Sequence, residues 1–107
     1  MKELVDTEGN LTSGLAKALD HIFKKYDLDL DNSLCPAELA AFATATNGAP
    51  FTTEDLDEIH MYFTCDDNGL TKQGFYEMYH TQSMADSSET WRDLKAHGVG
   101  DNFEIDK

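Results

Sequence analysis

The chain has 107 residues, of which 21 are acidic and 8 are basic, so its formal net charge at pH 7 is −13. This acidic excess argues against binding to nucleic acid or to anionic membranes, and it favours cations or basic partner segments as ligands. The length allows one domain with a modest core and excludes an enzyme domain joined to a separate regulatory domain.

Apolar residues before residue 27 predict a first helix. They recur at helical spacing and would occupy one face. Either Thr12 or Ser13 is the expected N-cap, because a hydroxyl can accept a hydrogen bond from an N–H group of the first turn. The residues on the apolar face are Leu15, Leu19, Ile22, Phe23 and Tyr26.

Residues 27–38 are the most informative segment of the sequence. Ca²⁺ takes about six to eight oxygen ligands, and alternate side chains of a tight loop can turn inward around one ion. Ser33, at the seventh place, would offer its backbone carbonyl, and Glu38 is long enough to offer both carboxylate oxygens. The spacing therefore predicts a site for one Ca²⁺, with an ordinary loop of solvated carboxylates as the alternative. The carboxylates at the first, third, fifth and twelfth places are Asp27, Asp29, Asp31 and Glu38.

Two residues of this segment depart from the usual calcium-loop pattern. Asn32 stands at the sixth place, where the backbone must adopt a positive φ, and asparagine tolerates that conformation better than most residues other than glycine. Cys35 stands at the ninth place, which often carries an oxygen ligand. A thiol is a poor ligand for a hard cation, so we expect a water molecule at that position.

A second helix should follow the loop. Pro36 suits a first helical turn, and Leu39 and Phe42 continue one apolar face. The segment 47–50 then ends the helix. Residues 12–48 therefore form a first helix-loop-helix unit, which resembles the calcium-binding units of the calmodulin-type EF-hand family.

Residues 52–84 repeat this pattern without its full set of ligands. When the second predicted loop is aligned on the end of its preceding helix, Thr64 takes the first place. The twelfth place falls on Gly74, or on Phe75 if the loop keeps its full length. None of these residues carries a carboxylate, so we expect this second, degenerate unit to be free of metal, with a weak second site as the alternative.

The degenerate unit still has a structural role in this interpretation. Paired loops form a short antiparallel bridge, and four helices bury a core that two cannot. Leu34 and Leu70 are the expected partners in that bridge.

Residues 86–98 predict a fifth helix with Trp91 and Leu94 on one face. A helix this short is only marginally stable in isolation, and we therefore expect it to dock on the other helices. Trp91 and Leu94 could fill the chain's own apolar groove beside Leu39 and Phe42, as a built-in ligand. Alternatively, the helix completes the core across the outside of the second unit.

The second half contains Gly69-Leu70-Thr71, Gly74-Phe75, and Glu89-Thr90-Trp91 with Leu94 and Gly98. These residues resemble an EF-hand unit of the mitochondrial Rho GTPases (Miro). The resemblance covers about residues 15–98, and similar modules precede tetratricopeptide repeats in some plant proteins. It implies a degenerate unit paired with a binding one and a following helix that lies on the pair like a ligand. No Walker-type glycine loop is present, so it implies nothing about GTPase activity.

The remaining motifs are weak. No segment resembles a signal peptide or a membrane span, so we expect no membrane insertion. Cys35 and Cys65 lack a disulfide framework and fit free thiols in a reducing compartment, which favours a cytoplasmic location. No nucleophile motif or zinc-ligand spacing is present, so we expect no enzymatic activity.

Together these features predict an all-α domain, an EF-hand pair with an additional C-terminal helix. The expected function is calcium-dependent regulation of a protein partner, for example one that offers a basic amphipathic helix, by a chain that is monomeric alone. The inward turn of Glu38 would move the helix that begins at Pro36 and repack Leu39 and Phe42. A calcium buffer, or a constitutive adaptor with a structural Ca²⁺ site, is the alternative.

Overall fold

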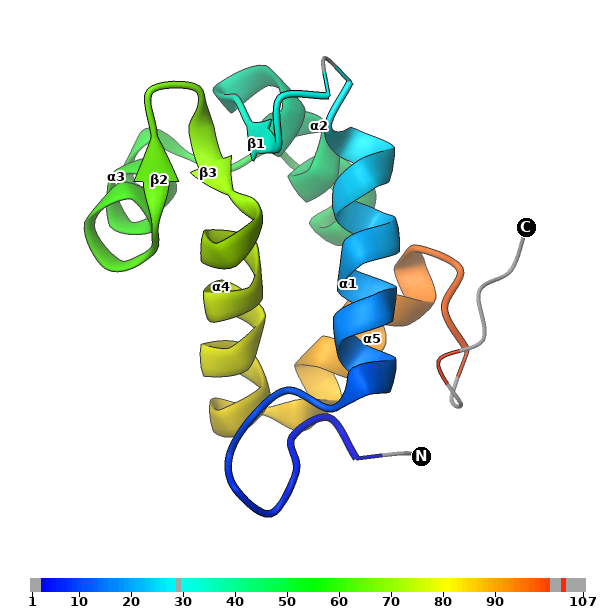
Figure 1. The fold of residues 1–107 in the computed structure, drawn as a ribbon. Coiled ribbons are helices and arrows are strands. Elements are labelled where there is room, and N and C mark those ends of the chain that lie inside the picture. Colours follow the sequence, from blue (N-terminus) through cyan, green and yellow to red (C-terminus); the bar gives the residue numbers. More distant parts are fainter. Residues whose placement is uncertain (1–2, 29, 101–102, 104–107) are drawn as a thin grey trace.

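The computed structural model of the chain describes residues 3–28, 30–100 and 103. These residues form five helices and one small three-stranded sheet (Figure 1). The all-α prediction is therefore correct for the helices and incomplete for the sheet. The helices are α1 (Ser13–Tyr26), α2 (Pro36–Asn47), α3 (Thr53–Tyr62), α4 (Lys72–Ala85) and α5 (Ser87–Ala96), and the strands are β1 (Ser33–Leu34), β2 (Cys65–Asp66) and β3 (Gly69–Thr71).

Threonine hydroxyls cap the beginnings of three helices. Of the two expected caps of α1, Thr12 takes the role, and its side chain accepts a hydrogen bond from the backbone N–H of Leu15. Thr52 and Thr71 accept equivalent bonds at the beginnings of α3 and α4. Each cap satisfies an N–H group that has no partner inside its own helix, so the helix boundaries follow from local sequence.

The sheet joins the loops of the two helix-loop-helix units. Its strand order is β1-β3-β2, and both pairings are antiparallel. Leu34 pairs with Leu70, as predicted, and both side chains are fully buried. Gly69 has a φ of +133°, and a Cβ atom there would overlap the carbonyl oxygen of Leu34. Only glycine allows the two loops to approach this closely.

The core lies between α1, α2, α4 and α5 and is rich in aromatic rings. Phe42 of α2 is at its centre: its ring centroid lies 5.3 Å from that of Phe75 and 6.3 Å from that of Tyr79, both on α4. Phe75 also packs edge-on against Phe23 of α1, at 5.6 Å. Edge-to-face pairs of this kind add to the free energy gained by burial of the rings.

Helix α3 packs much less extensively than the other helices. Ile59 is its only buried residue, whereas α1, α2, α4 and α5 each bury at least four. Figure 1 shows α3 at the outer edge of the molecule, beyond the β2–β3 hairpin and on the opposite side from α1. One face of α4 is therefore left without close helical cover.

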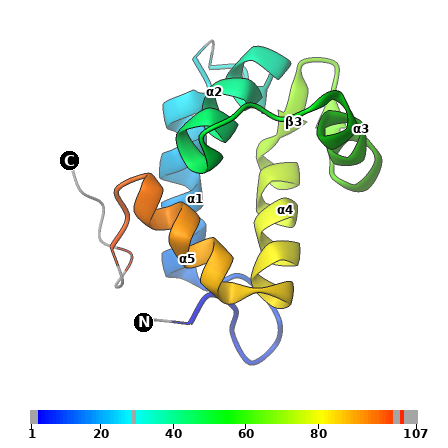
Figure 2. The ribbon, with the colours of Figure 1, turned by 180° about the vertical axis from the view of Figure 1, so that it is seen from behind.

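Helix α5 crosses the back of the molecule, from the end of α4 toward α2 (Figure 2). Leu94 is fully buried and Trp91 is 5% exposed. The Trp91 ring stacks on Phe103, with 5.0 Å between centroids. Trp91, Leu94, Leu39 and Phe42 thus all belong to the same buried cluster.

Buried polar groups fix the position of α5 on α4. The carboxylate of Asp93 accepts hydrogen bonds from the Tyr79 hydroxyl, at 3.1 Å, and from the Gln82 amide, at 3.0 Å. Burial and the adjacent Asp93 carboxylate raise the pKa of Tyr79 well above its usual value, so its hydroxyl remains a donor at neutral pH. Ser83 and Thr90 share a further buried hydrogen bond of 2.9 Å.

His97 connects the end of α5 to α2. Its ring lies parallel to that of Phe42, with 5.3 Å between centroids, and edge-on to Tyr26 of α1. Its Nε2 atom lies 2.6 Å from the Thr46 hydroxyl, while Nδ1 is buried without a hydrogen-bond partner among the described residues. A positive charge on this ring would have little to stabilise it.

The stability of the fold should therefore decrease in mild acid because of His97. Burial lowers the pKa of His97, Lys25 and His21 lower it further, and Asp93 opposes them. Since the folded pKa is below the unfolded value of about 6.5, the unfolded chain takes up the proton first. Stability is fully present above about pH 6.5 and is lost as the pH falls through the folded pKa. Urea unfolding at a series of pH values should show this loss, and His97→Gln, which does not ionise, should reduce it; parallel pH profiles for the two proteins would contradict the assignment.

Candidate metal centre

The carboxylate of Asp27 organises the first loop. Asp27 follows the last residue of α1, and its Oδ1 and Oδ2 atoms accept hydrogen bonds from the backbone N–H groups of Asp31, at 3.3 Å, and Asn32, at 2.9 Å. Asp31 in turn accepts a bond from the Ser33 N–H, at 3.0 Å. These bonds turn the chain back on itself, so that the loop closes around its own acidic side chains.

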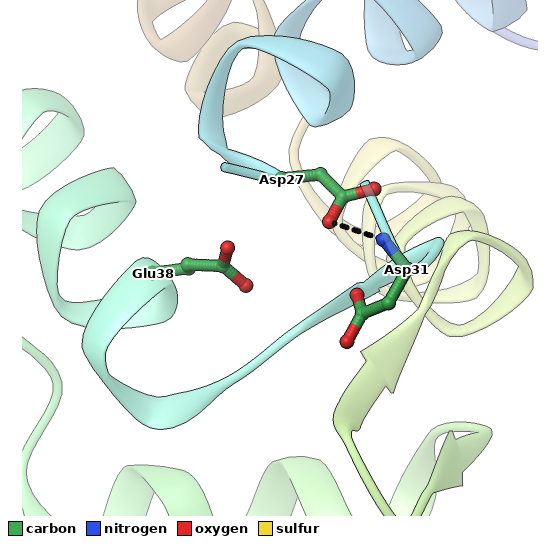
Figure 3. Close-up of side chains that lie close together, drawn as sticks. All are labelled: Asp27, Asp31 and Glu38. Atoms are coloured by element: carbon green, nitrogen blue, oxygen red, sulfur yellow. Dashed lines mark hydrogen bonds between the residues drawn. The ribbon is translucent and has the colours of Figure 1, made fainter. Parts of the chain in front are cut away.

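Three carboxylates converge at this loop. Asp27, Asp31 and Glu38 each place one oxygen within 4.8 Å of the other two. Figure 3 shows the three side chains, which come from the end of α1, from the loop and from the first turn of α2, around one common space. Asp27 and Glu38 are 4% and 5% exposed. Asp29, the remaining predicted carboxylate ligand, lies outside the described residues.

Glu38 is held in place at the beginning of α2. One carboxylate oxygen accepts a bond from the N–H of Cys35, at 2.9 Å, and the other from the N–H of Leu28, at 2.7 Å. The first of these bonds belongs to the N-terminal cap of α2, which has Pro36 in its first turn. A movement of the Glu38 carboxylate is therefore coupled to the orientation of α2.

No ion pair between described residues reaches the carboxylates of this cluster. The ion pairs of the described residues join other groups, namely Asp20 with Lys24 and Lys72, and Arg92 with Glu89 and Asp93. Among the described residues, the groups that donate hydrogen bonds to the carboxylates of Asp27 and Glu38 are backbone N–H groups. Like charges at this separation repel, and a divalent cation among them would remove that repulsion.

The side chain of Ser33 makes a contact that its predicted role as a carbonyl ligand does not involve. Its backbone belongs to β1, opposite Thr71, and its side chain is fully buried. Its hydroxyl donates a hydrogen bond of 2.7 Å to Asp66 in the second loop, and this bond is the main reason why the pKa of Asp66 is lowered. Ser33 thus links the two loops through its side chain, a contact that loop spacing alone does not reveal.

Among the described residues of the loop, Leu30 (57°) and Asn32 (65°) adopt a positive φ although neither is glycine. The conformation of Asn32 was predicted from its place in the loop, whereas that of Leu30 was not. A leucine in this region carries strain of about 1–2 kcal/mol, because its Cβ atom approaches the neighbouring carbonyl oxygen.

Replacing Leu30 with Asn should therefore stabilise the fold, by about 0.5–1 kcal/mol, since asparagine tolerates the left-handed region better. Leu28→Asn is the matched control, because Leu28 has the same 78% exposure without a positive φ. Urea unfolding of the metal-free proteins measures both changes. Equal shifts for the two variants would show that the loss of an exposed leucine, and not relief of strain, causes the effect.

The second loop is a short hairpin stabilised by its own side chains. Asp66 accepts hydrogen bonds from the N–H groups of Asn68, at 2.9 Å, and Gly69, at 3.1 Å. Glu77 accepts bonds from the N–H and hydroxyl groups of Thr64, at 2.8 and 3.0 Å. These bonds lower the pKa values of both carboxyl groups. Within the described residues, the Asp27 cluster is the one group of three or more potential metal ligands that converges.

The chain was compared with protein-family models and with known proteins. No protein-family model matches the chain. The chain is 28% identical over 105 residues to the probable mitochondrial Rho GTPase gemA of Dictyostelium discoideum. The aligned region covers 92% of this chain and 16% of that relative. The chain is therefore similar, at low identity, to a small part of a protein named as a mitochondrial Rho GTPase.

Proposed function

We propose that this chain is a non-catalytic regulatory domain of the EF-hand type, which binds one Ca²⁺ at the loop of residues 27–38 and modulates a partner protein. The observation that carries the proposal is the convergence of Asp27, Asp31 and Glu38. Asp29 and the carbonyl group of Ser33 would complete the set of ligands. The similarity to a named Rho GTPase agrees with the EF-hand resemblance of the sequence.

The donor chemistry fits a hard cation. Each converging residue offers carboxylate oxygen, which suits Ca²⁺ or Mg²⁺, while the imidazole and thiolate ligands preferred by zinc are missing from the cluster. A flexible loop with a long glutamate at its end suits the larger ion, because Mg²⁺ demands a tighter octahedral arrangement. Cys35 and Cys65 are free thiols, which supports a reducing compartment such as the cytoplasm.

The geometry also suggests how binding would reach a partner. A bound ion supplies positive charge at the centre of the loop. Glu38 would leave its backbone partners and turn toward Asp27 and Asp31, and α2 would move with it. Phe42 lies on α2 and stacks on His97, so a rotation of α2 changes the contact between α2 and the end of α5. Glu38 and Phe42, both on α2, thus connect the metal loop to His97 at the end of α5 through direct contacts.

Calorimetry and the emission of Trp91 together test this function. We expect one Ca²⁺ per chain and a change in Trp91 emission on binding. Trp91 lies on α5, the helix that α2 contacts, and its ring is buried against Phe103. Bound Ca²⁺ without a change in emission or in exposed apolar surface would favour a buffer, or an adaptor with a structural site. Absence of Ca²⁺ binding up to about 1 mM Ca²⁺ would refute the proposal. A dissociation constant of that size corresponds to a binding free energy of about −4 kcal/mol.

A further inference from the structure

His97, the residue that directly follows α5, lies between the two helices that flank the metal loop. The centroid of its ring lies 5.6 Å from that of Tyr26, the last residue of α1, and 5.3 Å from that of Phe42 on α2. Tyr26 directly precedes Asp27, the first carboxylate of the metal loop. A change in the angle between α1 and α2 therefore changes the surroundings of the His97 ring.

The hydrogen bonds around this ring determine which nitrogen can take up a proton. The Thr46 hydroxyl donates its one hydrogen to the carbonyl oxygen of Phe42, at 2.7 Å. It can therefore only accept from the Nε2 atom of His97, which lies 2.6 Å away. Nδ1 is thus the unprotonated nitrogen, and it is buried without a hydrogen-bond partner among the described residues. A proton on Nδ1 would place a charged N–H group in the core without an acceptor.

The charged and titratable groups around His97 leave the enclosed ring neutral. Lys25 and His21 of α1 disfavour a positive charge on it, and Asp93 of α5 favours one. Glu38 is the only charged residue of α2, and its carboxylate bonds to backbone N–H groups at the metal loop. Burial has the largest effect and lowers the pKa of His97 below its usual value. The ring is therefore uncharged at neutral pH while α1 and α2 enclose it.

We propose that His97 takes up a proton when the metal loop binds Ca²⁺. This inference rests on the proposed movement of α2 and adds a second signal to it. As Glu38 turns toward Asp27 and Asp31, α2 carries Phe42 and Thr46 away from the ring, and water reaches Nδ1. His97 then recovers the proton affinity of an exposed histidine.

The coupling acts in both directions, because two linked binding equilibria change each other by the same factor. If Ca²⁺ binding promotes protonation of His97, then protonation of His97 promotes Ca²⁺ binding. Mild acid therefore strengthens the response to Ca²⁺ through His97. This effect opposes the protonation of carboxylate ligands, which weakens Ca²⁺ binding as the pH falls. The domain becomes a Ca²⁺ sensor whose sensitivity depends on pH.

NMR titration of the wild-type chain tests the proposal directly. After assignment of the His97 ring signals, their pH dependence is recorded in Ca²⁺ and in chelator. The pKa of His97 should be higher in Ca²⁺. The sign is diagnostic, because the charge of a bound cation repels a second positive charge and would by itself lower this pKa. A rise therefore indicates that the surroundings of the ring have changed.

Calorimetry with Ca²⁺ at about pH 8 and about pH 5.5 measures the reciprocal effect. The wild-type chain should lose some affinity at the lower pH, because carboxylates take up protons. His97→Gln cannot gain a proton at this position, so its loss of affinity should be at least about twofold larger. His60→Gln, at an exposed position of α3, is the matched control and should lose as much as the wild type. Circular dichroism at both pH values checks that each protein keeps its helices.

The outcomes separate this inference from the metal proposal. One Ca²⁺ per chain with an unchanged or lowered pKa of His97 would overturn the proton coupling and leave the metal site intact. Equal losses of affinity for the wild type and His97→Gln would also contradict the coupling. Absence of Ca²⁺ binding at both pH values would overturn both proposals. The NMR result comes from the wild-type chain, so it decides the question even if His97→Gln fails to fold.

Discussion

Glu38→Gln is expected to weaken Ca²⁺ binding at least about 100-fold. The substitution keeps the length of the side chain but removes one negative charge and one of the two oxygens that can bind an ion. The remaining amide oxygen can still accept a backbone bond from Cys35 or Leu28, which Glu38 accepts in the structure. The variant should therefore fold and lose affinity, and calorimetry measures the loss directly.

Unfolding experiments give an independent measure of the same effect. At a Ca²⁺ concentration of 100 times its dissociation constant, the wild-type chain should gain about 2.7 kcal/mol in free energy of unfolding. At that concentration, a variant with 100-fold weaker affinity should gain only about 0.4 kcal/mol. The difference is large enough to appear clearly in urea unfolding midpoints.

Glu77→Gln is the matched control for this experiment. Glu77 occupies the second unit, where it accepts hydrogen bonds from Thr64 and contributes nothing to the Asp27 cluster. Its replacement should leave the stoichiometry and affinity for Ca²⁺ unchanged within about threefold. If Glu77→Gln reduces binding as strongly as Glu38→Gln does, the ion is bound at the second loop and the assignment of the site is wrong.

Local sequence was sufficient to predict the parts of the fold that depend on local interactions. The Thr12 cap, the exit helix at Pro36 and the positive φ of Asn32 each depend on a few neighbouring residues. The Leu34–Leu70 pairing involves distant residues, yet it follows from the alignment of two similar loops. Convergence of Asp27, Asp31 and Glu38 was likewise predictable, because the loop spacing itself brings them together.

Other features depend on packing between distant elements and left no local pattern. The hydrogen bond from Ser33 to Asp66 requires the exact approach of two loops that are 33 residues apart. The poor packing of α3 could not be read from its sequence, because its apolar positions, such as Leu56, resemble those of a well-buried helix. The positive φ of Leu30 runs against the preference of leucine, so propensity alone points away from it.

Leu94→Ala is expected to destabilise the fold by about 2–5 kcal/mol, because it leaves a cavity at a fully buried position. Arg92→Ala should change stability by no more than about 1 kcal/mol, since the Arg92 side chain is 64% exposed and its shorter ion pair, with Glu89, lies at the surface. Urea unfolding in chelator measures both variants.

The form of the Leu94→Ala transition also decides between the two interpretations of α5. Leu94 shares one core with α1, α2 and α4, and the buried bond between Tyr79 and Asp93 holds the helix on α4. We therefore expect one cooperative transition with a lower midpoint, as for a helix that completes the core. A built-in ligand would behave differently: α5 would detach first, and a separate early change in Trp91 emission would precede the loss of helical signal. Such a biphasic curve would show that α5 is a replaceable occupant of the groove. A movement of α2 would then release α5 from the groove and would not merely shift the contact between the two helices.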